Sequence, residues 1–286
     1  IFESSNIGGY PITDVWSYQP PSYHSIRQST YGDVDGDGKK EILIALLNQN
    51  QVSSEKILIF KNNGDNNFVI SEINVSHGLV NPDTPNYKAL EVLDDTNGDG
   101  KNEIMIEYEI ITPGLRDWTF YAHNIIQIFQ KDNQGYTQLF KNDHVHNETF
   151  VDAYPQIVSF TNIGDADGDG KKEFILGGFV TKLYGHLNPY RFLIYEYENN
   201  NYSTEKIEVA NPENIMDSDI NSADLDNDNK KEIIIGRKDT IYIFKATSNN
   251  KYNEISNNRG LINMVSKSPG MAIGVSDLDK NNRPEL

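Results

Sequence analysis

The residues best suited to chemistry lie in five short acidic segments, which begin at Asp33, Asp95, Asp165, Asp224 and Asp277. Each segment reads D-x-[DN]-x-[DN]-[GN]-x-x-E. Carboxylate or amide side chains therefore occupy positions 1, 3, 5 and 9 of every segment. The residue at position 7 can add its backbone carbonyl, so each segment is a candidate for an oxygen-rich site.

Ligand sets made only of oxygen are typical of Ca²⁺, which takes about six to eight such ligands. We therefore predict up to five bound Ca²⁺ ions, one in each of the five acidic loops. The predicted ligands of the first three loops are Asp33, Asp35, Asp37, Lys39 and Glu41, then Asp95, Asn97, Asp99, Lys101 and Glu103, then Asp165, Asp167, Asp169, Lys171 and Glu173. Those of the last two loops are Asp224, Asp226, Asp228, Lys230 and Glu232, then Asp277, Asp279, Asn281, Arg283 and Glu285.

Position 6 of the loops supports the same interpretation, because it is Gly38, Gly100, Gly170, Asn229 or Asn282. Glycine and asparagine tolerate the left-handed backbone conformation that a tight loop needs. The alternative is a set of solvated acidic turns. However, several carboxylates within roughly 5 Å repel one another without a cation. The repetition of one spacing in five places therefore favours cation binding.

Apolar runs surround the acidic loops and indicate short β-strands. One run precedes each loop after the first, another follows each of the first four loops, and a β-like stretch follows each polar turn farther on. The runs before those turns share a signature, which reads Ile59-Phe60-Lys61, Ile128-Phe129-Gln130, Ile194-Tyr195-Glu196 and Ile243-Phe244-Lys245. Each repeat therefore predicts four strands, with the acidic loop between the first and the second.

Repeated four-stranded units of roughly 40–60 residues are typical of a β-propeller. We predict an all-β chain forming one propeller domain over residues 1–286, with five blades of four antiparallel strands. The expected blades span 16–75, 87–142, 155–210 and 217–256, and residues 270–286 with 1–15 form a composite fifth blade. A fragment of a larger ring is the alternative. An array of independent sheets is less favoured, because one four-stranded sheet cannot bury both of its faces.

Composition excludes several partners and chemistries. The chain has 25 basic and 42 acidic residues, a net charge of −17, which would repel nucleic acid and anionic membranes. No stretch reaches the roughly 18 apolar residues of a membrane span, so no membrane insertion is expected. The chain has no cysteine, which removes disulfides and thiolate chemistry.

The acidic loops resemble the Ca²⁺ loops of the FG-GAP/VCBS repeat family, which includes the propeller head of integrin α subunits and many bacterial surface proteins. The resemblance covers nearly the whole chain. It implies a Ca²⁺-stabilised propeller that is secreted, extracellular or at the cell surface, and that serves adhesion or recognition. Two departures favour a bacterial-type relative: position 9 is Glu where integrins mostly have Asp, and the Phe-Gly/Gly-Ala-Pro signature is absent.

Strand parity predicts where a ligand would bind. In a four-stranded meander, the acidic loops and the polar turns share one face of the ring, and the longer connections lie on the opposite face. Binding residues usually lie on long loops held by a rigid scaffold, and aromatic side chains with a polar edge suit sugar stacking or protein contacts. The predicted ligand-binding residues are Arg116, Trp118, Tyr121, His123, His144, Tyr184, His186 and Tyr190.

Three function classes remain open. The favoured one is a binding or adhesion module for a protein or cell-surface ligand. The alternatives are a lectin-like glycan binder and, less favoured, a carbohydrate-active enzyme similar to a polysaccharide lyase. No G-x-S-x-G, H-E-x-x-H or phosphate-binding glycine motif occurs. We therefore predict no catalytic residue.

Overall fold

The computed structural model describes residues 2–3, 13–14, 16–22, 24–48, 55–64, 67–76, 86–113, 119–149, 159–179, 182–183, 186–187, 190–209, 218–237, 240–256, 276 and 284. These residues form four antiparallel sheets of four strands each, together with two short strand pairs, and they include no helix. Within these ranges, therefore, no helix has the length and apolarity needed to cross a membrane. The predicted all-β class and the predicted four-stranded units are confirmed.

The four sheets follow one another along the chain. Sheet 1 contains β3 (His24–Gly32), β4 (Glu41–Asn48), β5 (Glu55–Asn62) and β6 (Phe68–Val75). Sheet 2 contains β7 (Asn86–Val92), β8 (Ile104–Pro113), β9 (Thr119–Lys131) and β10 (Tyr136–Thr149). Sheet 3 contains β11 (Ser159–Gly164), β12 (Glu173–Phe179), β15 (Tyr190–Glu198) and β16 (Asn201–Val209). Sheet 4 contains β17 (Ser218–Ala223), β18 (Glu232–Arg237), β19 (Thr240–Ser248) and β20 (Lys251–Glu254).

Each sheet is a meander, because its strands are hydrogen-bonded in chain order. The remaining strands form two short pairs, β1 (Phe2–Glu3) with β2 (Thr13–Asp14), and β13 (Lys182–Leu183) with β14 (His186–Leu187). Most of the residues predicted to complete a fifth blade, including 270–275 and 277–283, lie outside the described part of the chain. The composite blade and the closed ring therefore stay predictions.

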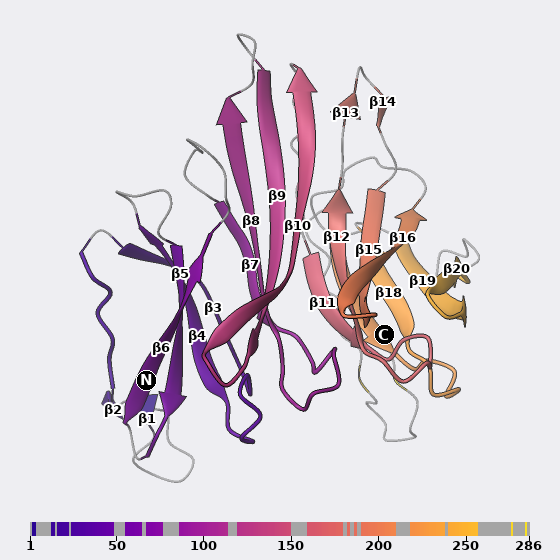
Figure 1. Ribbon diagram of the computed structural model, residues 1–286. Coiled ribbons are helices and arrows are strands. Elements are labelled where there is room, and N and C mark those ends of the chain that lie inside the picture. The colour runs from indigo at the N-terminus through magenta and orange to yellow at the C-terminus, as the bar shows by residue number, and fades with distance from the viewer. Residues whose placement is uncertain are drawn as a thin grey trace.

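The sheets stand beside one another in the order of the chain (Figure 1). The first strands of successive sheets lie side by side, β3 with β7 and β11 with β17, and a side chain of β11 reaches β7. Side chains join each of these strands to the backbone or side chain of the next. The contacts are Thr30 Oγ1 to Glu91 Oε2 (3.5 Å), Asn162 Nδ2 to the Val92 carbonyl (3.1 Å) and Ser222 Oγ to the Ile163 carbonyl (3.3 Å). The arrangement is propeller-like, with β3, β7, β11 and β17 as neighbours.

The core fills the spaces between adjacent sheets, and the second strands are buried on both faces. In β8, Ile104 and Ile106 pack in the cluster between sheets 1 and 2, whereas Met105 packs in the cluster between sheets 2 and 3. Successive side chains of a strand point to opposite faces. A second strand that packs against sheets on both of its faces is therefore apolar at consecutive positions, which explains the short unbroken runs after the acidic loops.

The outer face of sheet 1 is covered by the segment before β3. Trp16 packs against Phe60 and Phe68, with ring centroids 5.3 and 4.7 Å apart, and Tyr18 packs against Phe60 at 5.1 Å. These contacts bury Phe60 and the neighbouring leucines of the same face. The two aromatic residues near the start of the chain therefore contribute to packing.

The strands of sheet 2 run farther than the sequence predicted, and β8, β9 and β10 extend beyond the neighbouring sheets (Figure 1). Pairing of β9 with β10 continues to Thr119 opposite Thr149. The expectation that Tyr121, His123 and His144 lie in loops is therefore wrong, because they lie in β9 and β10. Neither strand contains a glycine or proline to interrupt the ladder.

Candidate metal centres

The described acidic loops are four, and each joins the first strand of its sheet to the second. The aspartate at position 1 holds the loop by accepting backbone hydrogen bonds. In the first loop, Asp33 Oδ1 accepts from the Gly36 N–H at 2.8 Å and Asp33 Oδ2 accepts from the Gly38 N–H at 2.8 Å. The same bond to the position 6 N–H recurs at Asp95 (2.9 Å), Asp165 (3.0 Å) and Asp224 (2.8 Å).

The backbone of each loop is left-handed at two places. At position 6, φ is 83° in Gly38 and 67° in Asn229, and Gly100 and Gly170 are similar, so the prediction for this position is confirmed. Position 4 is also left-handed, with φ of 77° in Gly36 and 62° in Asn227. The requirement at position 4 was not predicted. Two left-handed residues turn the chain sharply enough for the side chains at positions 1, 3 and 5 to converge.

The glutamate at position 9 is buried in every described loop, with at most 1 % of its surface exposed. One oxygen, Oε2, accepts a hydrogen bond from the backbone N–H of position 2. The four distances are 3.1 Å for Glu41, 2.9 Å for Glu103, 2.8 Å for Glu173 and 2.8 Å for Glu232. The other oxygen, Oε1, is buried and has no hydrogen-bond partner in any of the four.

A buried carboxylate oxygen without a partner is unfavourable, since desolvation penalises the charged form. Burial accordingly raises the pKa of Glu41 and Glu103 to about 7, and that of Glu173 to about 9. The neighbouring aspartates at positions 1, 3 or 5 raise these pKa values further. A cation placed among these oxygens would offset both the cost of burial and the repulsion by the aspartates, and it would lower these pKa values.

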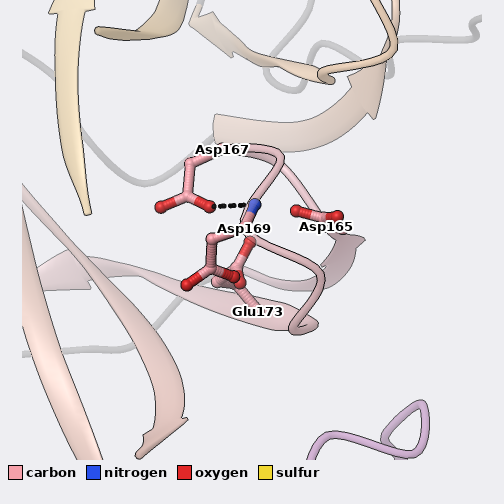
Figure 2. A group of neighbouring side chains, drawn as sticks. All are labelled: Asp165, Asp167, Asp169 and Glu173. Atoms are coloured by element: carbon pink, nitrogen blue, oxygen red, sulfur yellow. Dashed lines mark hydrogen bonds between the residues drawn. The ribbon is translucent and has the colours of Figure 1, made fainter. Parts of the chain in front are cut away.

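The third loop has the most complete acidic group. Asp165, Asp167, Asp169 and Glu173 each offer an oxygen, and these oxygens all lie within 4.8 Å of one another (Figure 2). Groups of three carboxylates whose oxygens also lie within 4.8 Å of one another occur in the other described loops. They are Asp33, Asp35 and Asp37; Asp95, Asp99 and Glu103; and Asp224, Asp226 and Glu232. In the first group, Asp35 Oδ1 is also buried without a hydrogen-bond partner.

These donor sets fit a hard divalent cation, because they consist of carboxylate oxygens without nitrogen or sulfur donors. Some predicted ligands lie outside the close groups, among them Glu41 and Asp228. At position 7, the backbone N–H of Lys39, Lys101, Lys171 and Lys230 donates to the position 5 aspartate at 2.9–3.0 Å. The amide of Asn97 accepts from the Asp99 N–H at 3.0 Å. The predicted ligands of the fifth loop, Asp277, Asp279, Asn281, Arg283 and Glu285, lie outside the described residues.

The structure adds a residue that the sequence analysis missed, at the end of the third strand of each sheet. Lys61 contacts Asp35 and lies 2.8 Å from Asp37 Oδ2, and Lys245 makes the same pair of contacts in the fourth loop. Gln130 donates to Asp99, and Glu196 accepts from Lys171 at 2.6 Å. The signal was present, because these residues end the four Ile-Phe/Tyr-x signatures.

Each of the first three loops also has a tyrosine near it that belongs to the next sheet along the chain. Tyr202 of sheet 3 lies 2.7 Å from Thr96 Oγ1 in the second loop, hydroxyl to hydroxyl. Tyr252 of sheet 4 has a buried hydroxyl without a hydrogen-bond partner, and its pKa is raised by burial and then by Glu173. Tyr136 of sheet 2 stands near the first loop, and its pKa is raised by burial and then by Asp35. Each of these three loops is therefore part of an interface between consecutive sheets.

The predicted ligand-binding residues are only partly described. His123 Nδ1 lies 3.0 Å from Asp143 Oδ2, so β9 and β10 hold a histidine–carboxylate pair. Tyr121 lies two residues before it, at the end of sheet 2 remote from the acidic loop. His144 lies in β10, His186 in β14 and Tyr190 at the start of β15. Arg116, Trp118 and Tyr184 lie outside the described residues.

A scan against protein-family models finds no match for this chain, and a search of curated proteins finds none either. The chemistry of the loops is therefore inferred from their geometry.

Proposed function

We propose that the acidic loops bind Ca²⁺ and that the ions stabilise a five-bladed propeller of the FG-GAP/VCBS type. The observation that carries this proposal is the buried Oε1 atom of the position 9 glutamate, which lacks a hydrogen-bond partner in all four described loops. Buried polar atoms are nearly always paired in folded proteins. The same buried atom recurs in all four described loops, and in the fourth the Lys245 ammonium already lies 3.4 Å from it. This recurrence supports a shared cationic partner, and a divalent cation has the required charge.

The ions have a structural role in this proposal. Each of the first three loops lies between two consecutive sheets, and every described loop carries carboxylates that repel one another. Binding a cation to the folded state alone stabilises it, by about 2.7 kcal/mol when the free cation stands at a hundred times its Kd. Several such sites add up to a large share of the stability of an ordinary domain.

The function of the propeller in this proposal is to bind a protein or cell-surface ligand outside the cell. The face opposite the acidic loops supports it, because β8, β9 and β10 project there and carry the His123–Asp143 pair. Cation binding and ligand binding would then occupy opposite faces of one rigid scaffold. A secreted or surface location provides the millimolar Ca²⁺ that weak loop sites require.

The test is calorimetric titration of chelator-treated protein with Ca²⁺, together with melting curves in Ca²⁺ and in excess chelator. We expect saturable binding at several sites. In chelator, the melting temperature should fall by about ten degrees or more, which corresponds to a loss of free energy of unfolding on the order of a few kcal/mol. Replacing Asp33 and Asp37 by alanine should remove one site. The control is Glu72→Gln on β6, which removes a charge outside the loops and should bind as the wild type does. An unchanged melting temperature in chelator would refute the proposal.

The ligand is sought with a glycan array and a panel of cell-surface proteins, with Ca²⁺ present throughout. A protein ligand whose binding weakens in His123→Ala, but persists in the Asp33 and Asp37 variant, would support a binding face opposite the loops. Saturable binding to one sugar class would instead favour the lectin-like alternative. Loss of ligand binding in the loop variant at an unchanged melting temperature would contradict the separation of the two faces.

A further inference from the structure

The residue that follows the aromatic residue of the signature in the third strand of each sheet differs among the four loops. It is Lys61 in sheet 1, Gln130 in sheet 2, Glu196 in sheet 3 and Lys245 in sheet 4. We infer that this residue sets the cation affinity of its loop, so that the four sites are graded: the third is tightest, the second is intermediate, and the first and fourth are weak. This inference rests on the proposal that the loops bind a divalent cation.

Strand pairing explains why this residue reaches the loop. Glu173, at position 9 of the third loop, is directly opposite Glu196 in the ladder between β12 and β15. In the other sheets, the residue after position 9 is opposite the aromatic residue of the signature, as in Ile42 with Phe60. The side chain that follows the aromatic residue therefore lies beside position 9. Antiparallel pairing fixes its place, so its charge acts on the site directly.

Glu196 brings a further carboxylate to the third loop. Its side chain is fully buried, and its Oε2 accepts from Asn250 Nδ2 at 2.9 Å. Its Oε1 accepts from Lys171 at 2.6 Å, and the same ammonium lies 3.1 Å from Asp169 Oδ2. A lysine stands at this position 7 in all four described loops, so Lys171 does not distinguish the third loop from the others. The four loop carboxylates already converge here (Figure 2), and Glu173 Oε1 has no hydrogen-bond partner. Glu196 therefore adds a fifth negative charge beside the four converging carboxylates of the third loop.

Lys61 and Lys245 bring the opposite charge to the first and fourth loops. The Lys61 ammonium contacts both Asp35 and Asp37 and so neutralises the two side chains that a cation needs. The Lys245 ammonium contacts Asp226 and Asp228 and lies 3.4 Å from Glu232 Oε1. These lysines are competitors built into the chain. A divalent cation must displace the ammonium and then bind in its field, which lowers the affinity of both loops.

Gln130 carries no charge and donates to Asp99 in the second loop. It neither adds a ligand charge nor competes as a cation. In the charge of this residue the second loop therefore lies between the two extremes, and its own carboxylates number three where the other described loops have four.

The experiment is calorimetric titration of the folded chain with Ca²⁺ alone, for the wild type and for Lys61→Gln, Lys245→Gln and Glu196→Gln. We expect each lysine variant to tighten one weak site roughly tenfold or more, and Glu196→Gln to weaken the tightest site roughly tenfold. Gln130→Lys, at a partly exposed position, should weaken the second site without a buried charge. Lys56→Gln is the matched control, since it removes an ammonium paired with Glu72 outside the loops and should leave every affinity unchanged.

The outcomes separate this inference from the proposed function. If the wild type binds Ca²⁺ and the lysine variants bind it with unchanged affinities, the grading is overturned while Ca²⁺ binding stands. If folded wild type binds no Ca²⁺, the proposed function fails and the grading fails with it. Circular dichroism and melting curves in chelator establish that each variant is folded before its affinities are compared.

Discussion

The position 9 glutamate combines two roles in one side chain. One oxygen accepts the N–H of position 2 and fixes the loop to the start of the second strand. The other oxygen faces the aspartates without a hydrogen-bond partner. A glutamine could keep the first role, but it would lose the charge that the second requires. Cation binding, as proposed above, would account for the same acidic residue at position 9 of all five loops in the sequence.

Asn229 tests the backbone requirement of the loops. Its φ of 67° is left-handed, where glycine is tolerated and a branched or unbranched L-residue is strained. We expect Asn229→Ala to lower the free energy of unfolding by about 1 kcal/mol and Asn229→Gly to change it by a few tenths. Urea denaturation in saturating Ca²⁺ measures both. Equal stability of the two variants would show that the loop does not depend on this conformation.

Gly177 shows how close packing restricts the choice of residue in a second strand. Gly177 in β12 lies between the Phe192 ring of β15 and Ile220 of β17. A Cβ atom added to Gly177 would stand 2.4 Å from the Phe192 ring and 3.0 Å from Ile220 Cδ1. Sheets 3 and 4 can therefore pack closely here only because Gly177 has no side chain.

We expect Gly177→Ala to destabilise the protein by about 1–3 kcal/mol, because the ring must move within a filled core. The measurement is the midpoint of urea unfolding at constant Ca²⁺. Ser71→Ala on the exposed part of β6 is the control and should stay within about 0.5 kcal/mol of the wild type. A stable Gly177→Ala variant would mean that the interface between sheets 3 and 4 is looser than the structure describes.

The sequence predicted the local features of the elements well. The acidic loops, their left-handed position 6 and the four strands of each repeat depend on neighbours within a few residues. Features that depend on pairing between distant strands were missed. Glu196 stands opposite Glu173 through the register of β15, and Tyr202 reaches Thr96 from the next sheet. Tyr121 and His123 were assigned to a loop, because the sequence does not show how far the pairing of β9 with β8 and β10 extends.

At the scale of the whole molecule, buried acids outside the loops make stability depend on pH. Glu55, at the start of β5 and away from the acidic loop, is 2 % exposed, and burial raises its pKa from 4.5 to about 7. The proton is therefore held more tightly in the folded state than in the unfolded chain. The stability that this proton provides is fully present below pH 4.5 and is lost as the pH rises to about 7.

We expect Glu55→Gln to remove this dependence, with a gain over the wild type on the order of 3 kcal/mol at pH 8 and little difference at pH 4. Urea unfolding at a series of pH values, with Ca²⁺ saturating throughout, provides the comparison. At each pH, the contribution of the acidic loops to the free energy of unfolding is then the same in the wild type and in Glu55→Gln. A difference between the two proteins that is constant across this range would contradict the raised pKa of Glu55.

The tyrosines that reach the loops have a consequence for the order in which the chain can be made. Among the described residues, each of the first three loops is contacted by a tyrosine of the sheet that follows it: Tyr136, then Tyr202, then Tyr252. A ribosome releases the chain from its N-terminus. The first loop thus lacks its tyrosine until residue 136 has emerged, and the second until residue 202 has. Each of these three loops is therefore completed one repeat behind synthesis, and until then its carboxylates lack the interface that the next sheet provides.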